Sequence, residues 1–324
     1  MGYLLRRIGH AVFLLLGVSM LAFLFTTLAP GNYFDEMRLN PQIAPETLKA
    51  LRAQYGFDQP LRQRYVHWAN SLLHGDWGFS FAYNSAVAPL LWPRARNTLV
   101  LTLSATFFAW LIALPLGVWS AEGRGRLRDR ALSWTAAALL VVPELALALG
   151  LLALAARTGW LPTGGMNSTN WDGWPYQRKV FDMALHMVLP VTVLVASALP
   201  LLLGHVRAAV REVLDAPFLR VAEGHGVGRA RLLYRHALPA AANPLITLFG
   251  FSLGALLSGS LLVEIVMSWP GLGPFLLEAI LARDLYVVIG GVLLSTLFLV
   301  AGNLVADLLL YWADPRIRVG ARSS

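Results

Sequence analysis

The sequence contains no cysteine, which excludes disulfide bonds, thiolate catalysis and metal sites with cysteine ligands. Charged residues are scarce, at 14% of the chain, and the only lysines are Lys49 and Lys179. Neither follows a glycine-rich turn, and no G-x-x-x-x-G-K-[ST] phosphate-binding motif is present. Six of the seven histidines show no metal-ligand spacing: His67, His74, His186, His205, His225 and His236. We therefore expect no catalytic residue, metal or cofactor in this chain.

Apolar residues are abundant, at 57% of 324 residues, and the mean hydropathy is +0.59. A helix that crosses a bilayer needs about 20 consecutive apolar residues. Six stretches approach or exceed this length: residues 11–28, 98–119, 131–156, 183–206, 240–263 and 285–306. Their internal glycine and proline residues are tolerated in spanning helices, because neighbouring helices satisfy the freed backbone groups. The sequence therefore predicts an all-α, polytopic membrane protein with six transmembrane helices.

The distribution of positive charge predicts the orientation. Arginines cluster near the N-terminus, in segments 124–130 and 207–235, and in the tail. Because short loops rich in arginine stay in the cytoplasm, we expect both termini to be cytoplasmic. The first apolar run is too long for a cleaved signal peptide and lacks an A-x-A site, so it is an expected spanning helix. The net charge of +8 then lies beside anionic lipid, which disfavours a nucleic-acid partner.

Two segments are expected on the outer side. Residues 45–56 and the run beginning at Pro60 have helical patterns, and in the second run Leu61, Tyr65, Trp68 and Leu72 form one apolar stripe. We expect this stripe to pack on the helical bundle or to lie at the membrane interface, and a ligand site is the alternative. Residues 157–182 are rich in Gly, Asn, Ser and Trp and are expected to form a loop.

The loop at residues 215–239 is polar and rich in arginine, and it lies between two predicted spans. Asp215 is a suitable N-cap and Pro217 suits a first helical turn. A short helix is expected to Glu223, followed by a reversal at Gly224 and Gly226, where glycine permits positive φ. A second helix is expected from residue 228 or 229 to Leu238, before Pro239. The exposed apolar residues predicted on the first helix are typical of a docking surface.

Sequence motifs along almost the whole chain resemble one family. Ala222-Glu223-Gly224-His225-Gly226 with Leu238-Pro239 is similar to the cytoplasmic coupling segment of binding-protein-dependent ABC transporter permeases. Further matches indicate the dipeptide, oligopeptide and nickel branch: LLRRIGH near the start, APGN at 29–32, HGDWGFS at 74–80, RARNTL at 94–99, EIVMSWPGLG at 264–273, RDLYVVIGGVLL at 283–294 and DPRIR at 314–318.

The resemblance implies a type I ABC importer permease of the bacterial inner membrane. It implies four kinds of partner: a second permease, two cytoplasmic ATPase subunits that use ATP and Mg, an extracytoplasmic solute-binding protein, and a peptide-like solute. It also implies a coupling role for these residues: Asp215, Pro217, Phe218, Leu219, Arg220, Ala222, Glu223, Gly226, Leu238 and Pro239. The chain departs from the family pattern at Glu223-Gly224-His225, where Gly224 is expected to loosen the short helix by up to about 1 kcal/mol.

The expected organisation has three parts. Residues 1–97 contain the first transmembrane helix and the outer helical segment, and residues 98–313 form a five-helix permease core with the coupling loop at 207–239. Residues 314–324 form a cytoplasmic tail.

Acidic residues within the predicted spans are costly in lipid and therefore informative. Glu144 is expected near the middle of the third span, where it either lines the translocation route or is a protonated or partnered structural residue. Glu264 is expected near the outer end of the fifth span, and Asp307 near the inner end of the sixth with Asn303 one turn earlier. For Glu264 and Asp307 we expect hydrogen bonding between helices, and a direct role in substrate binding is the alternative.

The sequence also offers alternatives to a peptide importer: a serine hydrolase, an ion-coupled transporter and an importer with another cargo. Gly250-Phe251-Ser252-Leu253-Gly254 matches the nucleophile string of serine hydrolases, but such an elbow needs a strand-to-helix turn. An ion-coupled secondary transporter using Glu144 is a second alternative, although it has no need of the loop at 215–239. Among importers, nickel, glutathione, opines or antimicrobial peptides are alternatives to dipeptides and oligopeptides as cargo.

Overall fold

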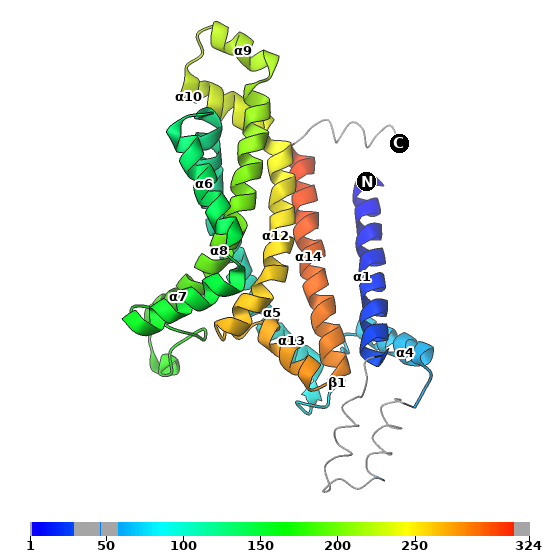
Figure 1. The fold of residues 1–324 in the computed structure, drawn as a ribbon. Coiled ribbons are helices and arrows are strands. Elements are labelled where there is room, and N and C mark those ends of the chain that lie inside the picture. Colours follow the sequence, from blue (N-terminus) through cyan, green and yellow to red (C-terminus); the bar gives the residue numbers. More distant parts are fainter. Residues whose placement is uncertain (1, 29–45, 47–57, 314–324) are drawn as a thin grey trace. The chain divides into compact units, whose positions relative to one another are not determined.

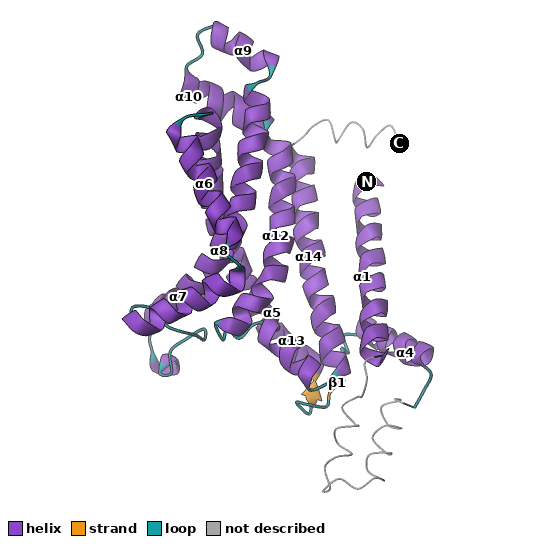
Figure 2. Cartoon of the chain, in the orientation of Figure 1, coloured by secondary structure: helices purple, strands orange, loops and turns teal. Residues whose placement is uncertain are grey.

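The computed structural model describes residues 2–28, 46 and 58–313. Within that range the chain is almost wholly helical (Figures 1 and 2). The strands β1 (Phe79–Ser80) and β2 (Ser85–Ala86) form a short antiparallel pair in which Phe79 faces Ala86. Apart from Glu46, the helix expected at 45–56 lies outside the described residues, as does the tail at 314–324.

Five of the described helices are long and apolar enough to cross a membrane: α1 (Gly2–Leu28), α5 (Val87–Glu122), α8 (Tyr176–Leu214), α12 (Ala242–Val266) and α14 (Leu285–Ala313). They confirm five of the six expected spans. Each helix extends beyond its predicted bounds at one end or both. The predicted bounds were those of the apolar stretches, and polar residues continue the helix beyond them. The expected all-α membrane fold is therefore confirmed.

The remaining expected span, residues 131–156, is not one straight helix. It consists of α6 (Leu127–Val141) and α7 (Glu144–Thr158), which meet at an angle of 93°. Val142 has an extended backbone with φ −78° and ψ 116°, as expected for a residue before proline, and Pro143 has no N–H to continue the helix. Six crossings result only if this bent pair counts as one span. Glu144 is the first residue of α7 and does not lie in the middle of a helix.

The described chain divides into two compact units, one with residues 2–3, 99–269 and 299–313 and the other with residues 4–28, 58–98 and 270–298. In the first unit, α8 is in contact with α6, α7 and α12. Small residues allow close approach there, since a Cβ atom at Gly117 would lie 2.6 Å from Val206 of α8. The domain boundaries expected at residues 97 and 313 stay a prediction.

Glycines also bring α12 and α14 together in this unit. A Cβ atom at Gly250 would overlap Ala306, and one at Gly254 would overlap Leu299. Ser252, which lies between them on α12, donates to the Phe249 carbonyl at 2.7 Å and accepts from Trp110 Nε1 at 2.9 Å. Because α12 is continuous here, the G-x-S-x-G string is a helix-packing motif and has no nucleophile elbow.

In the second unit, α4 (Leu61–Leu73) carries the predicted aromatic stripe. Trp68 is buried and clusters with Phe23 of α1 and Ile289 of α14, while Tyr65 and Leu72 pack against the same cluster. The expected packing on the bundle is confirmed for these three residues, whereas Leu61, the first residue of the predicted stripe, is 38% exposed. The same unit contains α13 (Leu272–Leu281), whose first backbone N–H donates to Thr98 Oγ1 at 2.8 Å.

The segment expected as a loop at 157–182 is shorter than predicted. Helix α7 continues to Thr158 and α8 begins at Tyr176, so the loop is limited to residues 159–175 and includes the 3-10 turn η1 (Trp171–Gly173). Residues 176–182, which were expected in this loop, form the first turns of α8.

Candidate functional site

Helix α9 (Pro217–Gly224) is a short helix beyond the end of α8 (Figure 1). Pro217 occupies its first turn, as expected, but the N-cap is Ala216, which has an extended backbone and no side-chain cap. The predicted N-cap role of Asp215 is wrong, because this residue ends α8. The predicted reversal is also corrected: Gly226 has φ of +79°, while Gly224 is the last residue of the helix.

One side of α9 is anchored and another is exposed. Leu219 is 1% exposed and belongs to the core of the first unit together with Leu232 and Leu233. Phe218 and Val221 are 54% and 58% exposed, respectively. Arg220 and Glu223 are also exposed, and Ala222 is partly buried against the core. The helix therefore has a fixed attachment and presents an apolar surface with flanking charges.

The chain returns to the bundle through three consecutive helical pieces: α10 (Arg229–Arg231), the π-helix η2 (Leu232–Ala237) and α11 (Leu238–Ala240). The sequence predicts a helix here but not its π-helical turn. Pro239 lacks the N–H that an α-helix would donate to the Arg235 carbonyl, so the wider turn lies directly before it. Leu238 is partly buried and Pro239 is exposed.

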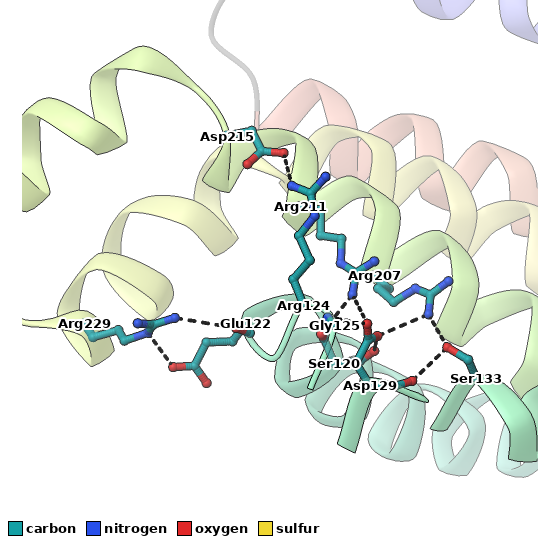
Figure 3. A network of polar contacts seen from close by, with 10 residues as sticks. All are labelled: Ser120, Glu122, Arg124, Gly125, Asp129, Ser133, Arg207, Arg211, Asp215 and Arg229. Atoms are coloured by element: carbon teal, nitrogen blue, oxygen red, sulfur yellow. Dashed lines mark hydrogen bonds and ion pairs between the residues drawn. The ribbon is translucent and has the colours of Figure 1, made fainter. Parts of the chain in front are cut away.

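A buried carboxylate, that of Asp129, lies in the first turn of α6. Asp129 is 8% exposed and accepts hydrogen bonds from Ser120 Oγ at 2.7 Å and the Gly125 N–H at 3.1 Å. Two arginines of α8 complete the cluster (Figure 3): Arg211 lies 2.7 Å from Asp129, and Arg207 lies 3.3 Å from it. One carboxylate therefore joins the end of α5, the start of α6 and the end of α8.

Two further ion pairs connect the α5–α6 turn to the chain on either side of α9. Arg124 pairs with Asp215 at 2.9 Å, just before α9, and Arg229 pairs with Glu122 at 2.9 Å, just after it. The Arg124–Asp215 pair is well exposed and contributes little stability. Because both ends of the segment are held, the position of α9 is tied to the α5–α6 turn as well as to α8.

Sequence reasoning missed Glu122 and Asp129. A signal was present, since Asp129 is the single acid among the four arginines of segment 124–130. A buried carboxylate beside such a concentration of positive charge is a natural ion-pair partner. Which arginines it pairs with depended on α8, more than 70 residues later in the chain.

The predicted intramembrane polar residues lie in different environments. Glu144 is partly buried in a pocket of about 200 Å³ lined by residues of α7, α8 and α12. Glu264 of α12 and Asp307 of α14 are buried, at 0% and 6% exposed, while Asn303 is exposed. In the part of the chain that the structure describes, no group of histidines and acids has the arrangement of a metal site.

Comparison with known families now identifies this architecture. Residues 113–319 match the family described as the binding-protein-dependent transport system inner membrane component, and residues 1–102 match the N-terminal region of such membrane components. The chain belongs to this family of permeases. It is thus a multi-pass permease subunit of a binding-protein-dependent ABC importer in the bacterial inner membrane.

The curated relatives match over nearly their full length. The chain is 32% identical to the oligopeptide permease AppB of Bacillus subtilis, covering 97% of this chain and 98% of AppB. It is also 32% identical to the dipeptide permease DppB of Escherichia coli K12, with 98% of each chain covered. The glutathione permease GsiC of Shigella flexneri is 32% identical, with 98% of this chain and 99% of GsiC covered.

A solved structure supports the fold. A chain of the inward-facing MetNI methionine ABC transporter aligns with a TM-score of 0.57 and 18% identity. The alignment covers 69% of this chain and 96% of that chain. At this identity the likeness concerns the fold alone, and it agrees with the family assignment.

Proposed function

We propose that this permease forms the translocation pathway for dipeptides and oligopeptides together with a second, homologous permease. The observation that supports this cargo is the near full-length similarity to AppB and DppB, which are named as oligopeptide and dipeptide permeases. The wider assembly contains an extracytoplasmic solute-binding protein that delivers the peptide and two cytoplasmic ATPase subunits. ATP and Mg are used by those ATPases, and this chain carries no cofactor.

Helix α9 is the contact point for an ATPase subunit in this proposal. Its exposed Phe218 and Val221 provide an apolar surface, and Arg220 and Glu223 provide charges around it. Burial of an aromatic residue within a polar rim is a common source of binding energy between proteins. The coupling set predicted from the sequence then has two roles: Phe218, Arg220 and Glu223 face the partner, and Leu219 holds the helix to its own subunit.

The contacts that hold α9 to its own subunit, through Leu219 and two ion pairs, provide a route by which movement of the ATPases reaches the membrane helices. When the ATPase pair closes on ATP, a displacement of α9 acts on the core of the first unit through Leu219, and on the end of α5 and the turn after it through the Glu122 and Asp215 ion pairs. Alternating access then follows from movement of packed helices between two arrangements. In this proposal α9 and both chain termini are cytoplasmic, consistent with the arginines that surround the loop.

The docking role of α9 is tested with one exposed and one buried apolar residue. In the assembled importer, Phe218→Ala is expected to reduce ATPase co-purification at least about tenfold without lowering the thermal stability of this chain. Leu219→Ala is expected to lower thermal stability by about 2–5 kcal/mol, because it leaves a cavity in the core. Trp160→Ala removes an aromatic residue that is 85% exposed on the loop after α7 and is the control. Undiminished ATPase binding by Phe218→Ala would contradict docking on this surface.

Glutathione is a second candidate cargo, because GsiC is as similar to this chain as AppB and DppB are. Competition uptake assays with a dipeptide and glutathione distinguish the two cargoes. An ion-coupled transporter would instead continue uptake without ATP and stop when the proton gradient is collapsed.

A further inference from the structure

The pocket that contains Glu144 lies within the first unit, where α7, α8 and α12 pack against one another. Its volume of about 200 Å³ is sufficient for an amino group and a small side chain. Leu201 and Phe251, which also line the pocket, are 48% and 63% exposed. The pocket therefore opens at a surface formed by α8 and α12.

The lining is apolar with few exceptions. Its polar side chains are Glu144, Ser197 and Ser252, and no basic residue lines it. The Ser252 hydroxyl is already bonded to Trp110 and to the Phe249 carbonyl. The Ser197 hydroxyl, which also lines the pocket, donates to the Leu194 carbonyl at 3.1 Å. Nothing in the lining supplies a positive charge to balance an ionised Glu144.

One carboxyl oxygen of Glu144 lacks a hydrogen bond in the described structure. Atom Oε1 is buried and has no hydrogen-bond partner among the described residues. An unsatisfied buried carboxyl oxygen is costly, so a ligand that donates hydrogen bonds and carries positive charge would be stabilised there. The residue that faces the carboxyl group is Gly259, and an atom at its Cβ position would be in van der Waals contact with both oxygens, at 3.7 and 3.8 Å, so the missing side chain leaves room for one small group.

We propose that the Glu144 pocket binds the ammonium group of a small organic cation, with Glu144 as the counter-ion and the apolar walls holding the adjoining carbon atoms. The identification of that cation as the amino terminus of the transported solute rests on the proposed peptide cargo. The substrate class is then a peptide or amine with a free amino group, and N-acylated analogues are disfavoured.

Binding is tested on the assembled importer without its solute-binding protein. A hydrophobic carbodiimide adds to carboxyl groups in apolar surroundings, and mass spectrometry measures the extent of modification at Glu144. Alanyl-alanine amide, which is a cation, is expected to slow this modification at least about fivefold at saturation, and its N-acetyl derivative is expected to have no effect. Equal protection by both probes, protection by neither, or no modification of Glu144 at all would overturn the proposal.

Transport is measured separately in proteoliposomes that contain the complete system. Glu144→Gln is expected to reduce uptake of a dipeptide at least about tenfold, and Gly259→Leu, which keeps the charge but fills the space, is expected to do the same. Asp172→Asn removes one exposed negative charge outside the pocket and is the control. Unchanged uptake in both pocket variants would contradict ammonium binding by the cargo. Failure of the wild-type system to import any peptide would contradict the peptide function, while the labelling result still decides whether the pocket binds an ammonium group.

Discussion

At the scale of single residues, Asp129 shows how one side chain organises the end of a bundle. Its carboxylate receives hydrogen bonds from Ser120 and Gly125 and pairs with Arg207 and Arg211. A buried ion pair does not by itself imply high stability, because desolvation opposes the attraction. Removing only one partner is nevertheless costly, since the other charges remain in place.

We expect Asp129→Asn to destabilise the chain by about 3 kcal/mol, because Arg207 and Arg211 would keep their charges without the central anion. In a chain of this size the loss corresponds to a fall in melting temperature of about 5 °C or more. Thermal unfolding of the purified protein in detergent measures it. Asp172→Asn, an exposed site, is the control, and equal melting temperatures for the two variants would show that the cluster contributes no stability.

At the scale of elements, the contact between α12 and α14 depends on residues without side chains. Gly250 and Gly254 lie where a Cβ atom would overlap Ala306 and Leu299, and Gly302 on α14 faces Leu253 of α12. Lipid is as apolar as these helices, so close packing of small residues is what favours their association. Glycine in a helix is therefore explained at these positions by packing and not by conformation.

Gly250→Ala is expected to destabilise the protein by about 1–3 kcal/mol through overpacking against the fixed Cβ atom of Ala306. Gly204→Ala on α8 is the matched control, because no atom lies within 4 Å of its added Cβ. That variant is expected to be neutral or to gain up to about 1 kcal/mol from helix propensity. Thermal unfolding of both variants checks the pair, and the packing account is wrong if Gly250→Ala is as stable as Gly204→Ala.

At the scale of the whole molecule, the function requires the loop that contains α9 and the loop between α7 and α8 to lie on opposite sides of the membrane. The arginine distribution supports a cytoplasmic α9, because positively charged short loops are retained there. The absence of cysteine makes this orientation directly measurable, since any cysteine that is introduced is the only one in the chain.

In intact cells, a membrane-impermeant maleimide is expected to label Asp172→Cys on the loop after α7 but not His225→Cys at the end of α9. After the membrane is opened, both are expected to react, because both positions are exposed. Modification of His225→Cys in intact cells would exclude a cytoplasmic ATPase as the partner of α9.

The sequence predicted the elements that depend on local patterns. Spans were found because apolar runs of bilayer length are a strong signal, and α9 was found because Pro217 and the following glycines limit its length. Ambiguous local signals produced the errors. Asp215 is a good N-cap residue in isolation, but in the structure it ends α8 and pairs with Arg124.

The sequence by itself determined the membrane fold, the family motifs and the position of the short helix α9, because composition, hydropathy and residue spacing are properties of contiguous segments. Only the tertiary structure decided that the third span bends by 93°, that Asp129 gathers arginines from α8, and that Glu144 lies in an apolar pocket. Those features depend on which distant residues meet when helices pack, and the energies of bending, ion pairing and burial are set by these neighbours.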